Sequence, residues 1–288
     1  MTTEIAPRYW KMNGAGNDIV VLDLRQSAYQ LNHSIAAEIA GAGPTACDQL
    51  MVLHAPETPG TDGRIRIFNT DGSSAQACGN GMRCVVRVLN EESGNTRFRL
   101  ETDAGILACE LSSDDLITVD MGEPRTAWDE IPLRDPFHDT RHIELQIGPM
   151  DAPILHSPSV VSMGNPHAVF WVDDISGYDL GRVGPMLETH PIFPEGANIT
   201  LAALVAEDTL KIATWERGAG LTRACGSAAC AAAVSAARTR RTGRSVTIHA
   251  PGGTLRIHWR DDNHVLMTGP TEHEHAGTLS LASQPHVE

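Results

Sequence analysis

Two cysteines, Cys78 and Cys225, stand at matching places in the chain and are the residues best suited to do chemistry. Small residues follow each of them, at 79–81 and at 226–228, and the two cysteines lie 147 residues apart, about half of the 288-residue chain. Each cysteine follows a loop that contains an acidic residue and glycine, and each precedes an apolar run without proline. The pattern predicts, twice over, a loop, a cysteine and then a helix.

A cysteine at the start of a helix is easier to ionise than most. The first helical turn carries N–H groups without intrahelical partners and the positive end of the helix dipole, and the thiolate is the reactive form of the side chain. The small residues after each cysteine would let backbone N–H groups approach a carboxylate. A lone cysteine is more often a small core residue, but two at matched positions of a repeat favour a functional pair.

Facing thiols that exchange a proton could perform one reaction particularly well. One thiolate removes a proton from one face of a carbon atom, and a thiol returns a proton to the other face, so the carbon is inverted. The α-proton of an amino acid is very weakly acidic, so the site must also stabilise an enediolate-like carboxylate, for which helix N-termini offer N–H donors. No segment resembles a cofactor-binding motif, so we expect no cofactor.

The repeat extends well beyond the cysteines. Polar, glycine-rich turns around Gly16 and Gly164 precede the two cysteines by 62 and 61 residues, and Gly122 and Gly269 each lie 44 residues after their cysteine. These matching spacings predict that the chain consists of two halves with the same arrangement of strands and helices. These are residues 1–124, residues 125–270, and a tail, 271–288, that packs back on the first half with an edge strand at 277–281.

Within each half, short strands surround one long helix. The predicted helices cover residues 33–40, 82–92, 178–189 and 228–240. The predicted strands cover residues 19–22, 48–53, 64–68, 96–101, 106–111, 116–120, 168–172, 199–205, 210–215, 245–249, 254–259 and 265–267. This order indicates an α+β fold, in which a curled, mostly antiparallel or mixed sheet wraps a central helix in each half.

Composition excludes several classes of protein. The formal net charge of −14 argues against nucleic acid or an anionic membrane as partner, and no apolar run reaches the length of a membrane span. Residues 1–10 lack a secretory signal, so we expect a cytoplasmic protein. Six cysteines without a C-x-x-C pair predict neither a disulfide framework nor a metal site, and Cys47, Cys84, Cys109 and Cys230 are predicted to be core thiols.

Six sequence blocks, in order along nearly the whole chain, resemble those of the diaminopimelate epimerase family. They are Asn13–Asp18, Asn69–Gly72, Ala77–Cys84, Met163–His167, Glu216–Gly220 and Ala224–Ser227. The wider group of two-cysteine racemases, proline racemase among them, is similar in its paired thiols but lacks this set of blocks.

The resemblance implies a function and a role for each block. The family interconverts LL- and meso-2,6-diaminopimelate, a precursor of lysine and peptidoglycan, in a cleft between two α/β halves, usually as a homodimer. Cys78 and Cys225 would be the two bases, and His167 and Glu216 would tune their pKa values. The residues that would bind the substrate are Asn13, Gln49, Asn69, Gly79, Asn80, Asn165, Asn198, Glu216, Arg217, Gly226 and Ser227.

The residues themselves support these roles unevenly. Diaminopimelate has an amino-acid group at each end, and Glu216 beside Arg217 offers both charges that the distal end needs; a surface ion pair is the alternative. His167 could equally be a turn residue, and Asn13, Asn165 and Asn198 could be turn asparagines.

The sequence departs from the family pattern in three places. The first block differs slightly around Asn13 and has Ile19 where phenylalanine is usual. Residues 41–48 are less rich in glycine, and Ile199–Leu201 replaces an acidic-aromatic pair. These departures bear on the pocket near residues 47–49 and 198–201, and both cysteine blocks are intact.

Two other functions remain open at this stage. A relative that acts on proline, hydroxyproline or another amino acid would use the same thiols, although a ring substrate has no distal zwitterion for Glu216 and Arg217 to bind. A redox or binding protein with a switchable Cys78–Cys225 disulfide belongs to another class. A cysteine hydrolase would need one nucleophile with a histidine base instead of two matched thiols.

Overall fold

The computed structural model describes residues 6–27, 29–75 and 78–279, so Ala77 of the first cysteine block and the predicted strand residues 280–281 lie outside it. The chain folds into two compact units. Unit 1 comprises the described residues of Met1–Ile117 and Pro270–Glu288, and unit 2 comprises Thr118–Gly269. The boundary predicted after Pro124 lies seven residues beyond the one between these units.

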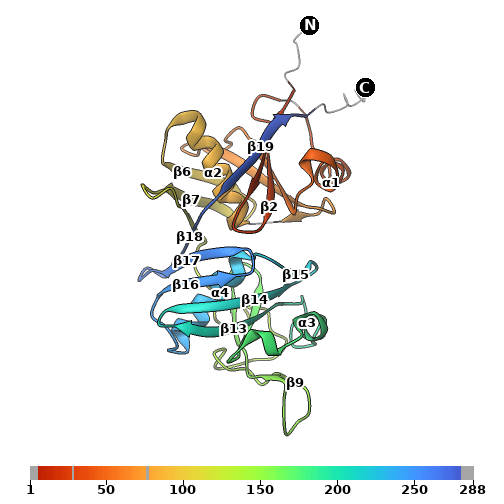
Figure 1. Ribbon diagram of the computed structural model, residues 1–288, viewed down its shortest axis with the longest axis vertical. Coiled ribbons are helices and arrows are strands. Elements are labelled where there is room, and N and C mark those ends of the chain that lie inside the picture. The colour runs from red at the N-terminus through yellow and green to blue at the C-terminus, as the bar shows by residue number, and fades with distance from the viewer. Residues whose placement is uncertain (1–5, 28, 76–77, 280–288) are drawn as a thin grey trace. The chain divides into compact units, whose positions relative to one another are not determined.

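Among its described residues, unit 1 contains a mixed sheet and the helices α1 and α2 (Figure 1). Its elements are β1 (Arg8–Asn13), β2 (Asp18–Asp23), α1 (His33–Gly41), a 3₁₀ turn (Gly43–Thr45), β3 (Gln49–His54), β4 (Gly63–Asn69), β5 (Ser74–Ala75), α2 (Gly79–Ser93), β6 (Arg97–Thr102), β7 (Gly105–Leu111) and, from the end of the chain, β19 (Glu272–Thr278). Strand β1 pairs antiparallel with β2, β2 parallel with β3, and β3 antiparallel with β4. Strand β4 then pairs antiparallel with β5 and parallel with β6, which pairs antiparallel with β7.

Unit 2 repeats this order of pairings. Its elements are β8 (Ile117–Asp120, which begins at the last residue of unit 1), β9 (Gln146–Ile147), β10 (Leu155–His156), β11 (Ser159–Ser162), β12 (Pro166–Trp171), a 3₁₀ turn (Ile175–Gly177), α3 (Leu180–Glu188), β13 (Asn198–Ala206), β14 (Thr209–Glu216), β15 (Gly220–Thr222), α4 (Gly226–Arg238), β16 (Ser245–Ala250), β17 (Gly253–Trp259) and β18 (Val265–Gly269). Strands β11 to β17 pair in the senses seen from β1 to β7, with β12–β13 and β14–β16 parallel. The predicted α+β fold with two pseudo-symmetric halves is therefore confirmed.

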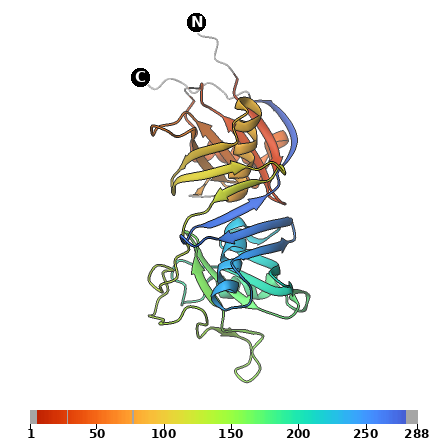
Figure 2. The ribbon, with the colours of Figure 1, turned by 90° about the vertical axis from the view of Figure 1, so that its left-hand side faces the viewer.

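The long helix of each unit is buried by the strands around it. Helix α4 packs against strands from β11 to β18 (Figures 1 and 2). Its alanines at 228, 229 and 231–233 are at most 2% exposed, and such small side chains let the strands approach the helix closely. Helix α2 packs against β1, β2, β3 and β7 and buries Val85, Val86 and Leu89. Burying these helices fixes their N-termini, where the two cysteines lie.

In each unit the first strand of the repeat has a further partner from elsewhere in the chain. Strand β19, which follows unit 2 in the chain, pairs antiparallel with β1, and Arg125, which follows β8, forms an antiparallel bridge with Ser162 of β11. The predicted return of the tail is thus seen at 272–278, five residues earlier than its expected start. The pattern misled because every residue of β19 is exposed or partly exposed, so an edge strand of this kind needs no apolar alternation.

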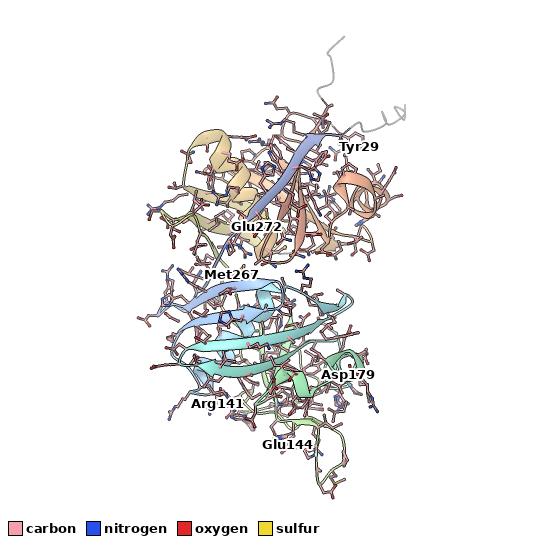
Figure 3. All side chains as sticks on the ribbon, in the orientation of Figure 1. Tyr29, Arg141, Glu144, Asp179, Met267 and Glu272 are labelled. Carbon is pink, nitrogen blue, oxygen red and sulfur yellow. The ribbon has the colours of Figure 1, made fainter. Side chains whose placement is uncertain are left out.

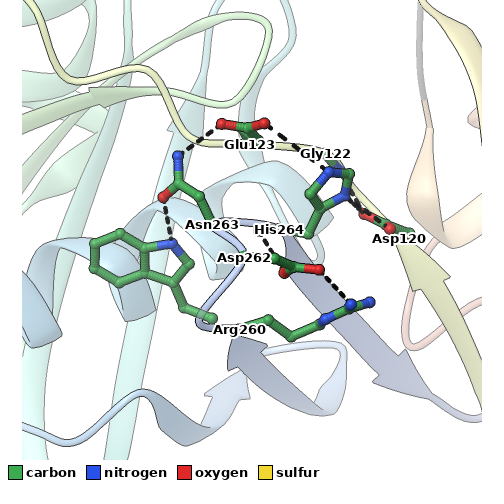
Figure 4. Close-up of polar contacts among 8 residues, drawn as sticks. Asp120, Gly122, Glu123, Arg260, Asp262, Asn263 and His264 are labelled. Carbon is green, nitrogen blue, oxygen red and sulfur yellow. Dashed lines mark hydrogen bonds and ion pairs between the residues drawn. The ribbon is translucent and has the colours of Figure 1, made fainter.

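A polar cluster fastens β8 to the turn between β17 and β18 (Figure 4). The His264 Nδ1 atom lies 2.9 Å from both carboxylate oxygens of Asp120, and the Asn263 amide donates to Glu123 Oε2 at 2.8 Å. The hydrogen bond to Asp120 raises the pKa of His264 above its ordinary value. Protonated His264 therefore stabilises this junction.

The cluster predicts a pH dependence of stability. Because the folded-state pKa of His264 is raised, its contribution is complete below about pH 6.5, the unfolded value, and is lost as the pH rises through the folded value. We expect His264→Gln to lower the free energy of unfolding, measured by urea titration, more at pH 5.5 than at pH 8.5. The difference should be a few tenths of a kcal/mol, because solvent screens the pair. His273→Gln on β19 is the matched control, and an equal loss at both pH values would contradict the prediction.

Candidate functional site

Cys78 is the N-cap residue of α2. Its backbone is extended (φ −146°, ψ 99°), and its Sγ atom accepts a hydrogen bond from the Gly81 N–H at 3.2 Å. An N–H bond of this kind, together with the helix dipole, favours the thiolate form of the side chain. Cys78 is partly exposed, so a small molecule can reach it.

Two glycines permit the close packing around this N-terminus. A Cβ atom on Gly81 would lie 2.3 Å from Met51 Sδ, and one on Gly14 would lie 2.9 Å from the Asn80 carbonyl oxygen. The turn that contains Gly14 therefore lies directly against the first turn of α2. The structure thus brings Asn13 and Asn80, far apart in the sequence, into one neighbourhood.

Three of the predicted amide residues of unit 1, Asn13, Gln49 and Asn69, lie at the same end of the strands β1, β3 and β4. Gln49 begins β3 opposite Asn69, the last residue of β4, and its amide donates to Asn69 Oδ1 at 3.2 Å. Asn13 ends β1 opposite Asp18 and donates to its carboxylate at 2.9 Å. The Asn13 Oδ1 atom also accepts from the Gly16 N–H, so Asn13 is both a turn asparagine and a member of this group.

Arg83 is a residue of this neighbourhood that the sequence analysis missed. It is completely buried, donates from Nη1 to Asn80 Oδ1 at 3.1 Å, and donates from Nε to the Pro270 carbonyl at 3.3 Å. The side chain of Asn80, itself 3% exposed, is therefore held from inside the unit. The equivalent position in α4, 147 residues further along the chain, is Cys230, so the two helices differ at this position. In the sequence, the available signal for Arg83 was an arginine within the apolar run of the helix.

Cys225 is the N-cap residue of α4, with a backbone conformation close to that of Cys78 (φ −132°, ψ 106°). Its Sγ atom lies 3.5 Å from Ser227 Oγ. Burial and the nearby charge of Glu216 raise the pKa of the Cys225 thiol well above its ordinary value, against the smaller influence of Ser227 and the Ala228 N–H. At Cys225, burial therefore outweighs the helix N-terminus, contrary to the expectation that a cysteine at a helix start ionises easily, and the thiol form is favoured as a proton donor.

Glu216 is the last residue of β14, and Arg217 begins the loop that follows it; both residues are held by hydrogen bonds. The Thr222 hydroxyl donates to Glu216 Oε1. The Arg217 N–H donates to Asn198 Oδ1 at 3.0 Å, and its Nη1 atom donates to the Glu195 carbonyl at 2.8 Å. Asn198, only 2% exposed, also donates to the Pro166 carbonyl, so its amide ties β12 to this loop.

His167 is a buried, neutral imidazole. Burial and the charge of Arg217 lower the pKa of His167 to about 3. Its Nε2 atom lies 2.8 Å from Asn165 Oδ1, an acceptor, so Nε2 carries the proton and Nδ1 is the bare nitrogen. Within the described residues Nδ1 has no hydrogen-bond partner. His167 on β12 is opposite Asn198 on β13, and β13 in turn pairs with β14, the strand that ends at Glu216.

The remaining cysteines are core residues, as predicted. Cys47, Cys84, Cys109 and Cys230 are all buried, and burial raises the pKa of both Cys47 and Cys84 to about 12. In the described part of the chain, no three His, Cys, Asp or Glu side chains are grouped as metal ligands. No helix among the described residues is long and apolar enough to cross a membrane.

The charge of Glu216 gives a direct prediction for Cys225. Replacing Glu216 with glutamine removes a negative charge beside the thiol, so we expect the pKa of Cys225 to fall. In a Cys78→Ser background, alkylation of Cys225 followed by mass spectrometry should become fast at a lower pH than in the parent protein. Glu207→Gln, on an exposed turn of the same unit, should leave the profile in place; an unchanged or alkaline-shifted profile for Glu216→Gln would refute the assignment.

Comparisons with known proteins found relatives that match nearly the whole chain. The family model described as diaminopimelate epimerase matches residues 9–127 and 159–274. A diaminopimelate epimerase of Brucella anthropi is 59% identical over 284 residues, which is 98% of this chain and 94% of that protein. One from Brucella suis is 58% identical over the same length and covers 93% of that protein.

Solved structures share the fold at low sequence identity. A hydroxyproline epimerase from Agrobacterium vitis superposes with a TM-score of 0.65 at 14% identity, covering 95% of this chain and 90% of the other. A phenazine biosynthesis protein of the PhzF family from Enterococcus faecalis gives a TM-score of 0.67 at 14% identity, covering 96% and 100%. These likenesses concern the fold alone.

Proposed function

Because this chain belongs to the diaminopimelate epimerase family, we propose that it is an isomerase that interconverts LL- and meso-2,6-diaminopimelate, with Cys78 and Cys225 as its two bases. The observation that carries the proposal is the repeated placement of a cysteine. Each of the two is the N-cap of the central helix of its unit, with nearly the same backbone angles.

The reaction divides between a thiolate and a thiol. From one stereoisomer, the Cys78 thiolate takes the α-proton while the Cys225 thiol delivers its proton to the opposite face of the same carbon. The C–H bond breaks as the new C–H bond forms, and the charge passes from Cys78 to Cys225. The reverse direction uses the same two groups with their roles exchanged. The raised pKa of Cys225 supports its starting role as the acid.

The first turns of α2 and α4 would hold the reacting carboxylate. Their N–H groups, those of Gly79 and Asn80 in one helix and of Gly226 and Ser227 in the other, point along the helix axis without intrahelical partners. As the proton leaves, negative charge grows on the carboxylate oxygens, and these donors stabilise it. Bulk at these positions would separate the donors from the substrate, which accounts for their small residues.

Charged and amide side chains of both units would bind the rest of the substrate. We assign the distal ammonium and carboxylate to Glu216 and Arg217, and the amides to Asn13, Gln49, Asn69, Asn165 and Asn198, of which Asn198 acts through the Arg217 backbone. His167, neutral at physiological pH, would serve as a hydrogen-bond acceptor near the reacting groups. We further propose a cytoplasmic homodimer that acts in lysine and peptidoglycan precursor synthesis without a cofactor.

The test is a comparison of substrates under reducing conditions. Purified protein is incubated with LL-diaminopimelate, L-proline and trans-4-hydroxy-L-proline, and the stereoisomers are separated chromatographically. We expect meso-diaminopimelate to form and the ring substrates to stay unchanged. Inversion of a ring substrate alone would place the protein with the hydroxyproline epimerase whose fold it shares. No inversion of any of the three substrates by folded, reduced protein would favour a binding protein or a disulfide switch.

A further inference from the structure

The last residue of α3, Glu188, bridges the two ends of the loop that carries Glu216 and Arg217. Its Oε2 atom accepts a hydrogen bond from Trp215 Nε1 at 2.6 Å, and its Oε1 atom accepts one from the Gly218 N–H at 2.9 Å. Trp215 and Gly218 are the residues immediately before and after the pair. One carboxylate therefore fixes the loop on both sides of the residues assigned to the distal end of the substrate.

The indole of Trp215 packs closely against α3 at Gly184. A Cβ atom on Gly184 would lie 2.5 Å from Trp215 Cγ, so only glycine leaves room for the ring at that turn of the helix. The N-terminus of α3 is capped by Asp179, labelled in Figure 3, whose carboxylate accepts from the Arg182 N–H at 3.1 Å. The helix that holds Glu188 is thus anchored at both ends.

Glu188 also contacts the segment that supports the guanidinium of Arg217. Its backbone carbonyl accepts from the Ala197 N–H at 3.2 Å. In the same segment, the Glu195 carbonyl accepts from Arg217 Nη1, and a Cβ atom on Gly196 would lie 3.1 Å from Arg217 Cδ. Glu188 is therefore hydrogen-bonded to the residues on both sides of the Glu216–Arg217 pair and to Ala197 of the segment that supports the Arg217 side chain.

We propose that Glu188 is a positioning residue that aims Arg217 at the distal carboxylate of the substrate, an inference that rests on the proposed function. The chemistry of the bridge requires a carboxylate, because two N–H donors face its two oxygens. A glutamine has one acceptor oxygen and would turn its NH₂ group towards one of the two donors. Glu188→Gln keeps the size of the side chain and breaks half of the bridge.

The test is a double-mutant cycle with Arg217. We expect Glu188→Gln to raise the KM for LL-diaminopimelate about tenfold, which corresponds to the loss of one charge-assisted hydrogen bond, with kcat within about twofold of the wild type. In an Arg217→Ala background the same substitution should leave KM unchanged. Glu207→Gln, which removes a carboxylate from an exposed turn of the same unit, should have no effect in either background.

A second measurement does not depend on activity. The indole N–H resonance of Trp215, assigned with Trp215→Phe, should move in Glu188→Gln and stay in place in Glu207→Gln. A wild-type enzyme that is active while Glu188→Gln keeps both its KM and the Trp215 resonance would overturn the positioning role alone. Effects of Glu188→Gln and Arg217→Ala that simply multiply would also overturn it. A folded wild type that is inactive on diaminopimelate would overturn the proposed function, and this role with it.

Discussion

Cys78→Ala and Cys225→Ala are each expected to lower kcat for epimerisation by about 10²–10⁴-fold or more, since each removes one of two groups that transfer a proton in the same step. KM should change much less, because the N–H donors and the distal binding residues remain. The measurement is the rate of meso-diaminopimelate formation from LL-diaminopimelate in the presence of reductant.

Matched controls for this experiment lie on the same two helices. Cys84 and Cys230 are completely buried beyond the first turn of α2 and of α4. Cys84→Ala and Cys230→Ala should lower the midpoint of thermal unfolding while leaving kcat near the wild-type value. Normal turnover in either Cys78→Ala or Cys225→Ala would rule out a reaction that needs both thiols.

Arg217→Ala should reduce kcat/KM for diaminopimelate roughly 100-fold, because a substrate carboxylate would lose its charged partner, at a cost of about 2–3 kcal/mol. Arg217→Lys should recover part of the loss, since an ammonium group keeps the charge but not the bidentate geometry. The measurement is steady-state kinetics with LL-diaminopimelate.

A control variant and a control compound separate this effect from a general loss of structure. Arg223→Ala removes an equal charge from an exposed site after β15 and should leave kcat/KM unchanged. An α-amino acid with the same carbon chain but no distal polar groups should react equally slowly with the wild type and with Arg217→Ala. If Arg217→Ala slowed that compound as much as it slows diaminopimelate, Arg217 would not be the distal ligand.

The order and type of the main elements could be predicted because the repeat constrains them twice. The cysteine blocks, the glycine turns and the apolar runs recur in register, and the strands of β2, β3, β4, β13 and β14 lie within a few residues of the predicted ones. The central helices begin at Gly79 and Gly226, earlier than the expected 82 and 228. Glycine is a poor helix former, so propensity alone delays the expected start, whereas the N-cap geometry of the cysteines fixes it.

Other elements carry too little local signal. Strand β1 contains Lys11, which is only 7% exposed. Its burial is possible because the ammonium group donates a hydrogen bond to the Ala46 carbonyl at 2.7 Å, and Ala46 lies 35 residues further along the chain. Strand β19 has no apolar face, and its pairing with β1 depends on the far end of the chain. Both segments form strands because they pair with parts of the chain that are distant in sequence, and not because their residues have a high strand propensity.

The residues that do chemistry were easier to find than those that hold them. The two cysteines, Glu216 and Arg217 stand in blocks with a distinctive pattern. Arg83 lies in the first cysteine block, but its role and that of Glu188 could not be predicted, because their partners lie 187 residues away at Pro270 and 27 residues away at Trp215. The lowered pKa of His167 likewise depends on burial and on Arg217, which no spacing in the sequence reveals.

The most direct test of the central claim is the fate of hydrogen in the first turnovers in D₂O. LL-diaminopimelate is mixed with the reduced enzyme, and the isotopic content of substrate and product is followed by mass spectrometry at low conversion. Two thiols on opposite faces predict that each meso product carries one solvent deuterium while the remaining LL substrate keeps its protium. Product that retains the substrate's own hydrogen would mean that one base serves both faces, and it would contradict the pairing of Cys78 with Cys225.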